Sequence, residues 1–138
     1  MQHGTRVQRL LAQLAPQQCA AVNAEWEEKV ATLEATEGPV LTIADKFGPP
    51  HVAEVAQANG IATLSVQHGC TDSHWVGCIY AKDQDGVVIH YEDKPREAAP
   101  KPIVSQFQIP AGCTSLVAFE WCNVDGIYKG DAVTVSSA

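Results

Sequence analysis

Basic residues are scarce in this chain, and they are not clustered. The 138 residues include 9 lysines and arginines against 16 aspartates and glutamates, which gives a formal net charge of -7. Nucleic acid and anionic membrane surfaces are bound through basic patches, so we expect neither as a partner. An acidic surface also provides no general attraction for small anions.

The sequence also lacks a long apolar run and a framework of paired cysteines. No stretch approaches the roughly 18 apolar residues of a membrane span, and the opening Met-Gln-His-Gly-Thr-Arg has no signal-peptide pattern. Five cysteines are an odd number without close pairing, whereas disulfide frameworks normally have an even count. We therefore expect a cytoplasmic protein. There is no phosphate-binding glycine-rich loop and no nucleophile elbow.

Residues 1–37 have the apolar spacing of helices. Two stripes are separated at Pro16, which suits a first helical position and disfavours helical geometry at Ala15. The stripes are Val7, Leu10, Leu11 and Leu14, then Cys19, Val22, Trp26, Val30 and Leu33. We predict an N-terminal helical extension that packs either on its own chain or on a second subunit, the latter giving a homo-oligomer.

Residues 38–138 have the pattern of a β-sandwich. Short strand-like stretches alternate with turns, and Asn59-Gly60 is the strongest hairpin signal because both residues tolerate positive φ. The expected strands are 40–43, 52–58, 61–66, 75–81, 87–91, 103–109, 114–121 and 132–136. Seven or eight short strands predict a mainly β fold, an immunoglobulin-like antiparallel β-sandwich.

Two histidines and a later cysteine–aspartate pair carry the most informative chemistry. His68 and His74 are six residues apart, and some fifty residues later Cys122 is followed at the third position by Asp125. His51, in Gly-Pro-Pro-His-Val, adds a third imidazole. Imidazole and thiolate suit iron, zinc or copper, and a carboxylate adds an oxygen donor that iron accepts readily. We predict that these five residues form a metal site.

Each of these residues also has an ordinary structural interpretation. His51 follows two prolines in an expected loop, and Cys122 ends an apolar strand, where a free cysteine often belongs to the core. Asp125 begins a common Asp-Gly turn. At a metal it would coordinate the ion, hold a water molecule, or leave a position open for a substrate or dioxygen. Cys70, between His68 and His74, is either a redox-active thiol or a small buried residue.

The order and spacing of these motifs resemble the iron domain of the desulfoferrodoxin/neelaredoxin family, the superoxide reductases. That family reads His-Val-Pro, then His-Pro-Met-x-x-x-His-Tyr-Ile-x-Trp-Ile, then Cys-Asn-x-His-Gly-x-Trp-Lys. The corresponding stretches here, within residues 48–130, are His51-Val-Ala, His68-Gly-Cys-Thr-Asp-Ser-His74-Trp-Val-Gly-Cys-Ile and Cys122-Asn-Val-Asp125-Gly-Ile-Tyr-Lys129. The resemblance implies the same sandwich fold and a mononuclear iron (Fe2+/Fe3+). It also implies that His51, His68 and His74 are equatorial ligands and Cys122 is the axial ligand.

The function implied by the resemblance is reduction of superoxide to hydrogen peroxide, with electrons from an external donor. We expect Cys122 and Asp125 to be the catalytic residues. Two departures are informative: Asp125 stands where the family has its fourth histidine, and Pro49-Pro50 replace the Glu-Lys before the first one. They leave two alternatives. One is a different non-haem iron enzyme acting on an organic substrate or dioxygen. The other is a non-catalytic module with a degenerate site that dimerises through residues 1–37.

Overall fold

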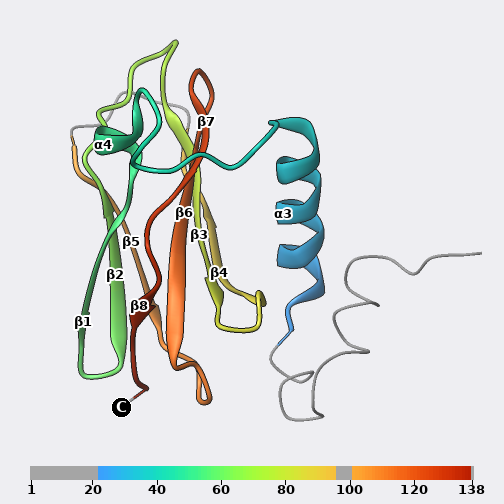
Figure 1. The fold of residues 1–138 in the computed structure, drawn as a ribbon, viewed down its shortest axis with the longest axis vertical. Helices are drawn as coiled ribbons and strands as arrows, with labels where there is room; N and C mark the ends of the chain where they lie inside the picture. The colour runs from blue at the N-terminus through green and yellow to red at the C-terminus, as the bar shows by residue number, and fades with distance from the viewer. Residues whose placement is uncertain (1–21, 96–100, 138) are drawn as a thin grey trace, which may run out of the picture.

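The computed structural model describes residues 22–95 and 101–137, so the predicted helical stripe at residues 7–14 lies outside the described part. Within these described residues, two helical segments and eight strands follow one another (Figure 1). The elements are α3 (Ala24–Thr36), α4 (Gly48–His51), β1 (Glu54–Ala58), β2 (Ile61–Val66), β3 (Val76–Asp83), β4 (Val88–Asp93), β5 (Ile103–Gln108), β6 (Ser115–Cys122), β7 (Gly126–Lys129) and β8 (Val133–Thr134).

The strands form two antiparallel sheets. One sheet has the order β1-β2-β5, and the other has the order β4-β3-β6-β7, with β8 also paired to β6. The mainly β sandwich predicted from the sequence is therefore confirmed. The hairpin at Asn59-Gly60 is confirmed as well, since the φ angles of the two residues are 54° and 78°.

The strand prediction differs from the structure at residues 40–43 and at residues 126–129. The expected strand at residues 40–43 is reduced to one parallel bridge between Leu41 and Tyr128. Strand β7 was not predicted, because its four residues, Gly126–Lys129, were interpreted only as the end of the Cys-Asn motif.

The five-stranded sheet buries a different cluster on each face. Alternate residues of β6, such as Leu116 and Ala118, join the core between the two sheets, and Phe119 and Trp121 belong to a second cluster with the helix residue Val30. Helix α3 covers this second face, in agreement with its position beside the sheet in Figure 1.

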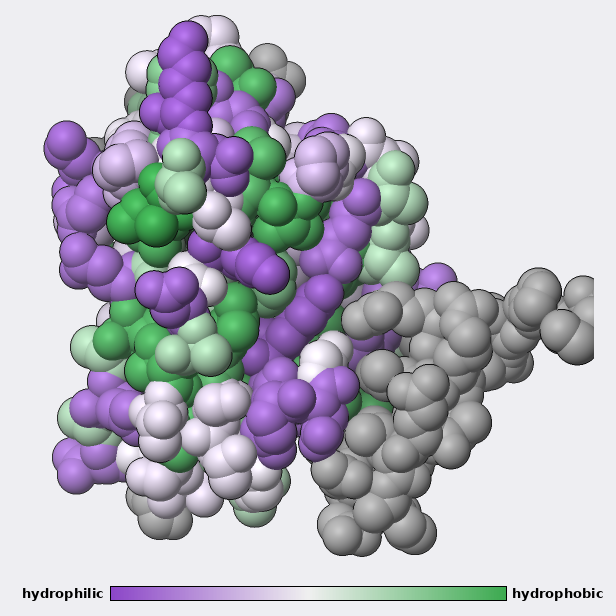
Figure 2. All heavy atoms as spheres, viewed as in Figure 1, coloured by the Kyte–Doolittle hydropathy of each residue, from purple (hydrophilic) through white to green (hydrophobic). Residues whose placement is uncertain are grey.

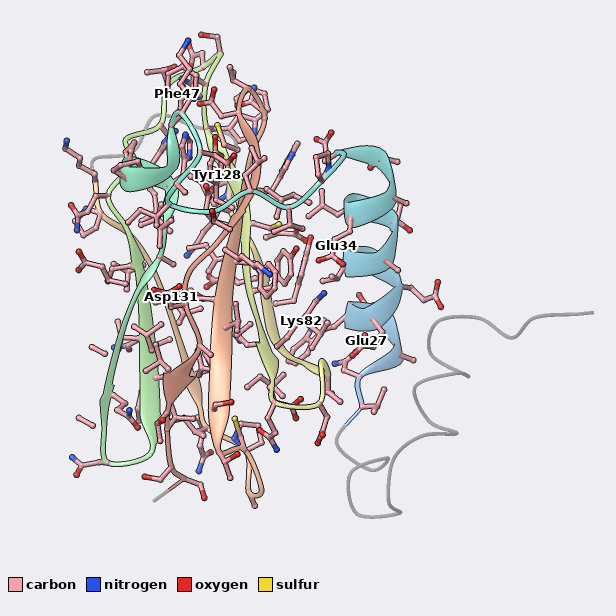
Figure 3. The ribbon with its side chains drawn as sticks, in the orientation of Figure 1. Glu27, Glu34, Phe47, Lys82, Tyr128 and Asp131 are labelled. Carbon is pink, nitrogen blue, oxygen red and sulfur yellow. The ribbon has the colours of Figure 1, made fainter. Side chains whose placement is uncertain are left out.

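Polar contacts fix α3 on its sheet. The Asn23 side chain caps the helix by accepting from Trp26 N at 3.1 Å. The buried Glu27 carboxylate accepts from Val88 N at 2.7 Å, and Lys82 Nζ contacts Glu34 Oε2 at 2.9 Å (Figure 3). The described part of the predicted helical extension thus packs on its own sandwich.

Candidate metal centre

Five side chains from three separate segments meet at one end of the sandwich. His51 comes from α4, and His68 and His74 come from the connection between β2 and β3. Cys122 is the last residue of β6, and Asp125 lies in the turn that joins β6 to β7. One nitrogen, sulfur or oxygen atom from each lies within 4.8 Å of the corresponding atoms of all the others. The structure brings together every residue of the predicted ligand set.

The donor atoms have the separations expected around a single ion. His74 Nε2 lies 3.1 Å from Cys122 Sγ and 3.2 Å from His68 Nε2. Asp125 Oδ2 lies 3.0 Å from His51 Nε2 and 3.1 Å from His74 Nε2. Ligands held at about 2.0–2.3 Å from one metal ion are themselves separated by roughly 3.0–3.7 Å, so the arrangement fits a metal ion without a large rearrangement.

The sequence predicted a loop around His51, whereas the structure has one helical turn there. Pro49 and Pro50 follow Gly48 in the first turn of α4, where proline needs no N–H bond, and Val52 N closes the turn onto Gly48 O at 3.0 Å. A Cβ at position 48 would lie 2.5 Å from the carbonyl oxygens of Thr42 and Ile43. Glycine is needed there for the turn to pack against that segment, and His51 is consequently buried.

Glu120 and Tyr128 contact His51, and sequence reasoning missed both. Glu120 Oε1 lies 2.9 Å from His51 Nδ1, and the Glu120 side chain has no exposed surface. The Tyr128 ring stacks on the His51 ring with centroids 4.5 Å apart and planes inclined by 9°. The available signal was spacing: Glu120 lies two residues before Cys122 in one strand, which places both side chains on the same face.

Asn123 ties the two ligand-bearing connections together. Its Oδ1 accepts from Trp75 N at 2.7 Å, and its Nδ2 donates to Ser73 O at 3.1 Å. Its backbone N–H also donates to Trp75 O at 3.1 Å. These bonds hold the segment that carries His74 against the one that carries Cys122.

Burial and neighbouring charges shift the pKa values in the cluster in opposite directions: the pKa of His51 is raised, and those of Asp125 and His68 are lowered. Burial lowers the pKa of His51, but the hydrogen bonds and charges of Glu120 and Asp125 outweigh it, so the net pKa is raised. Burial would raise the pKa of Asp125, yet its bonds to His51 and the charges of His51 and His74 lower it overall. Burial lowers the pKa of His68, and positive charge on the other two histidines lowers it further.

Burial also raises the pKa of Glu120 to about 7 and that of the Cys122 thiol to about 11. A thiol of this kind is protonated at neutral pH in the metal-free chain, and a bound metal ion deprotonates it. Metal uptake at this cluster would therefore be coupled to proton release at Cys122.

The remaining described cysteines lie in the core. Cys70, Cys78 and Cys113 are free and buried, and Cys70 Sγ accepts from Val76 N at 3.4 Å. These positions agree with the packing interpretation of Cys70.

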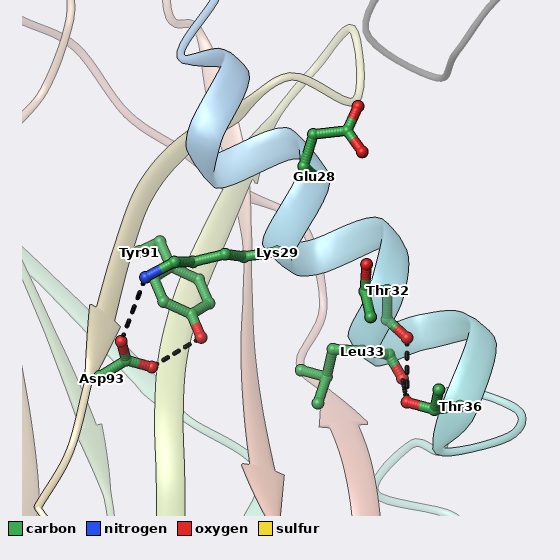
Figure 4. Close-up of a pocket in the computed structure, with 7 residues that line it drawn as sticks. All are labelled: Glu28, Lys29, Thr32, Leu33, Thr36, Tyr91 and Asp93. Carbon is green, nitrogen blue, oxygen red and sulfur yellow. Dashed lines mark hydrogen bonds and ion pairs between the residues drawn. The ribbon is translucent and has the colours of Figure 1, made fainter.

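A separate open groove of about 460 Å³ lies between α3 and β4 (Figure 4). Leu33 and Tyr91 line it, together with Lys29 and Asp93, whose charged atoms are 3.4 Å apart. No member of the metal-site cluster lines this groove.

Among the described residues, no helix is long and apolar enough to cross a membrane.

Solved structures share this fold. The superoxide reductase from Treponema pallidum matches with a TM-score of 0.55 and 22% identity, over 68% of this chain and 73% of that one. The superoxide reductase (1Fe-SOR) from Giardia intestinalis matches with a TM-score of 0.52 and 16% identity, over 62% of this chain and 98% of that one. No family model and no curated protein matches the sequence. The resemblance seen in the motifs is thus confirmed at the level of the fold.

Proposed function

We propose that the protein binds one iron ion through His51, His68, His74, Cys122 and Asp125 and reduces superoxide to hydrogen peroxide. Each superoxide would take one electron, supplied through the iron by an external donor, and two protons. The observation that carries the proposal is the convergence of three imidazoles, one thiol and one carboxylate on one point, in a fold shared with superoxide reductases.

The donor set favours iron over zinc. Structural zinc sites hold four ligands, and catalytic ones hold three protein ligands and a water molecule. Five protein donors exceed both patterns, while the mixture of imidazole, thiolate and carboxylate suits iron. When bound, iron would supply the one-electron chemistry, and the protein groups would hold the ion and set its electron affinity.

The side chains have distinct tasks in this proposal. Cys122, without exposed surface, supplies a thiolate shielded from water. The His74 side chain is 41% exposed and lies on the solvent side of the site, where a small reactant enters. Asp125 adds a negative charge to the ligand shell, which favours the ferric state over the ferrous one.

Asp125 also favours a second candidate function, in which the same centre acts on a neutral organic substrate or dioxygen. Its carboxylate and the Cys122 thiolate together place two negative charges at the ion, which disfavours an anionic reactant. The nearby exposed side chains include Phe47, which directly precedes α4, and Val124, between the two ligands of the turn. Figure 3 shows Phe47 at the same end as Tyr128, and Figure 2 shows hydrophobic and hydrophilic residues interspersed over the visible face.

The experiment is metal analysis of the purified protein, with an absorption spectrum of its oxidised form and a stopped-flow assay with pulsed superoxide. The proposal expects one iron per chain, a thiolate-to-iron charge-transfer band, and stoichiometric peroxide with loss of the ferrous form. Iron and the band without reaction with superoxide would support the second candidate. A chain without iron and without the band would refute both.

A further inference from the structure

Glu120 is a carboxylate enclosed in the interior of the sandwich. It lies in β6, between β3 and β7, with Ile79 and Tyr128 as its register partners on the two sides. Its side chain has no exposed surface, and within the described residues its Oε2 atom has no hydrogen-bond partner. Its Oε1 atom has one side-chain partner there, His51 Nδ1 at 2.9 Å.

A carboxylate in this place is costly for folding. Removing a charge from water is strongly unfavourable unless the charge is paired and its hydrogen-bonding capacity is satisfied. In Glu120 only Oε1 has a hydrogen-bond partner among the described residues, and Oε2 has none. An apolar residue would pack at this position of a central strand with less penalty. Local costs of this kind are expected at functional sites.

The contact with Glu120 determines how His51 faces the metal site. A neutral imidazole carries one N–H, and a carboxylate that accepts at Nδ1 places the proton on that nitrogen. Nε2 is then the nitrogen that faces the cluster, 3.0 Å from Asp125 Oδ2, and in the neutral ring it carries the lone pair that a metal ion would take. Stacking on Tyr128 fixes the plane of the same ring. Both the tautomer and the orientation of His51 are therefore set from the side away from the cluster.

We propose that Glu120 is a positioning residue of the metal centre, which holds His51 in the Nδ1–H tautomer and strengthens Nε2 as a donor to the metal ion. This inference rests on the proposed metal binding but not on the reaction of the iron. It predicts an effect on metal affinity and on the iron spectrum that is transmitted entirely through His51.

The test compares Glu120→Leu, Glu120→Gln and Glu27→Gln with the unmodified chain. Fe2+ affinity is measured anaerobically by competition with a chromophoric chelator. Replacement of such hydrogen-bond partners typically lowers metal affinity about 10- to 100-fold, and we expect a loss in this range for Glu120→Leu. Glu120→Gln should keep most of the affinity, because its amide oxygen still accepts from Nδ1–H. It should also raise the reduction potential and shift the charge-transfer band, since a neutral amide makes His51 a weaker donor.

Glu27→Gln is the matched control, because Glu27 is equally buried but lies on α3, on the other face of the sheet. It should leave Fe2+ affinity and potential unchanged. A double-mutant cycle supplies the second control: in a His51→Ala background, Glu120→Leu should cause almost no further loss.

Three results would overturn the inference. The first is full Fe2+ affinity in Glu120→Leu together with an unchanged reduction potential in Glu120→Gln. The others are a loss of Fe2+ affinity from Glu120→Leu that is as large in the His51→Ala background as in the unmodified chain, or an effect of Glu27→Gln as large as that of Glu120→Gln. If Glu120→Leu does not fold, the potential and band of Glu120→Gln decide in the same way. An unmodified chain that binds no Fe2+ would overturn the proposed function as well. Normal binding with inert Glu120 variants would overturn this inference alone.

Discussion

Replacing Asp125 by histidine should raise the reduction potential of the iron and increase the reaction with superoxide. The Asp125 oxygen lies 3.0 Å and 3.1 Å from the Nε2 atoms of His51 and His74, so its charge acts directly on the ligand shell. Histidine would replace that charge by a neutral donor. Loss of negative charge favours ferrous over ferric iron and makes the site less repulsive to an anion.

The size of the effect follows from Coulomb's law. A unit charge about 3–4 Å from the ion, at an effective dielectric constant of about 20, corresponds to roughly 4–5.5 kcal/mol. For a one-electron couple about 59 mV corresponds to a tenfold change in equilibrium, so this energy equals roughly 170–240 mV. The Asp125 side chain is 14% exposed, and water screens part of its charge. We therefore expect a rise of at least about 100 mV.

The assay is a redox titration that follows the thiolate-to-iron band, beside stopped-flow measurements with pulsed superoxide on both proteins. Asp131→Asn is the control, because it removes the same charge from an exposed residue that Figure 3 shows farther down the sandwich. It should leave the potential unchanged. An unchanged potential in Asp125→His, or an unmodified chain that already reacts near the diffusion limit, would refute the reasoning.

Three further predictions concern ligands, packing and pH. Alanine at His68 or His74 should remove a donor that the others cannot replace and abolish stoichiometric iron binding, which metal analysis would show; full iron content in both variants would contradict the ligand assignment. Deleting residues 1–37 should expose the sheet face that Val30 covers, and the truncated protein should then either dissociate from an oligomer or aggregate. Unchanged size, solubility and melting temperature would refute this prediction. Burial lowers the pKa of His90, the Glu92 charge opposes this shift and the Lys94 charge adds to it, so the folded state resists protonation and loses stability as pH falls below about 6.5. The melting temperature of His90→Gln should therefore fall less steeply on acidification than that of the unmodified chain. Equal slopes would contradict this prediction.

Elements with strong local signals were predictable from the sequence. Strand β2, Ile61–Val66, was predicted with its observed bounds, because β-branched and apolar residues alternate directly after a turn that accepts positive φ. Helix α4 was not, because Gly-Pro-Pro-His is too short to show helical periodicity. Its existence depends on packing against the carbonyl groups of Thr42 and Ile43, and such a tertiary contact leaves no sequence pattern.

The gathering of the five side chains at one place was predictable because donor chemistry and spacing are visible in the chain, whereas the residues that contact His51 from behind were not. Glu120 looks like a polar interruption in an apolar strand, and only the fold shows that its partner is His51, 69 residues away. Tyr128 was visible in the motif, but its stacking on His51 depends on the pairing of β7 with β6. Support of this kind depends on how strands and turns are assembled in space.

The origin of the ligands from three segments has a consequence for the order of assembly. Helix α4 contributes one donor of the cluster, the β2–β3 connection contributes two, and the β6–β7 hairpin contributes two, so no single segment offers three. Under the proposed function, a high-affinity site would arise only after chain segments from His51 to Asp125 have met, so iron uptake would be a late event that reports completion of the sandwich. A bound ion would act as a cross-link between distant parts of the chain, and its free energy of binding would add to the stability of the folded state. Because the loss of a single donor is expected to abolish stoichiometric binding, local opening of any one of the three segments should release the ion, so iron loss should precede global unfolding.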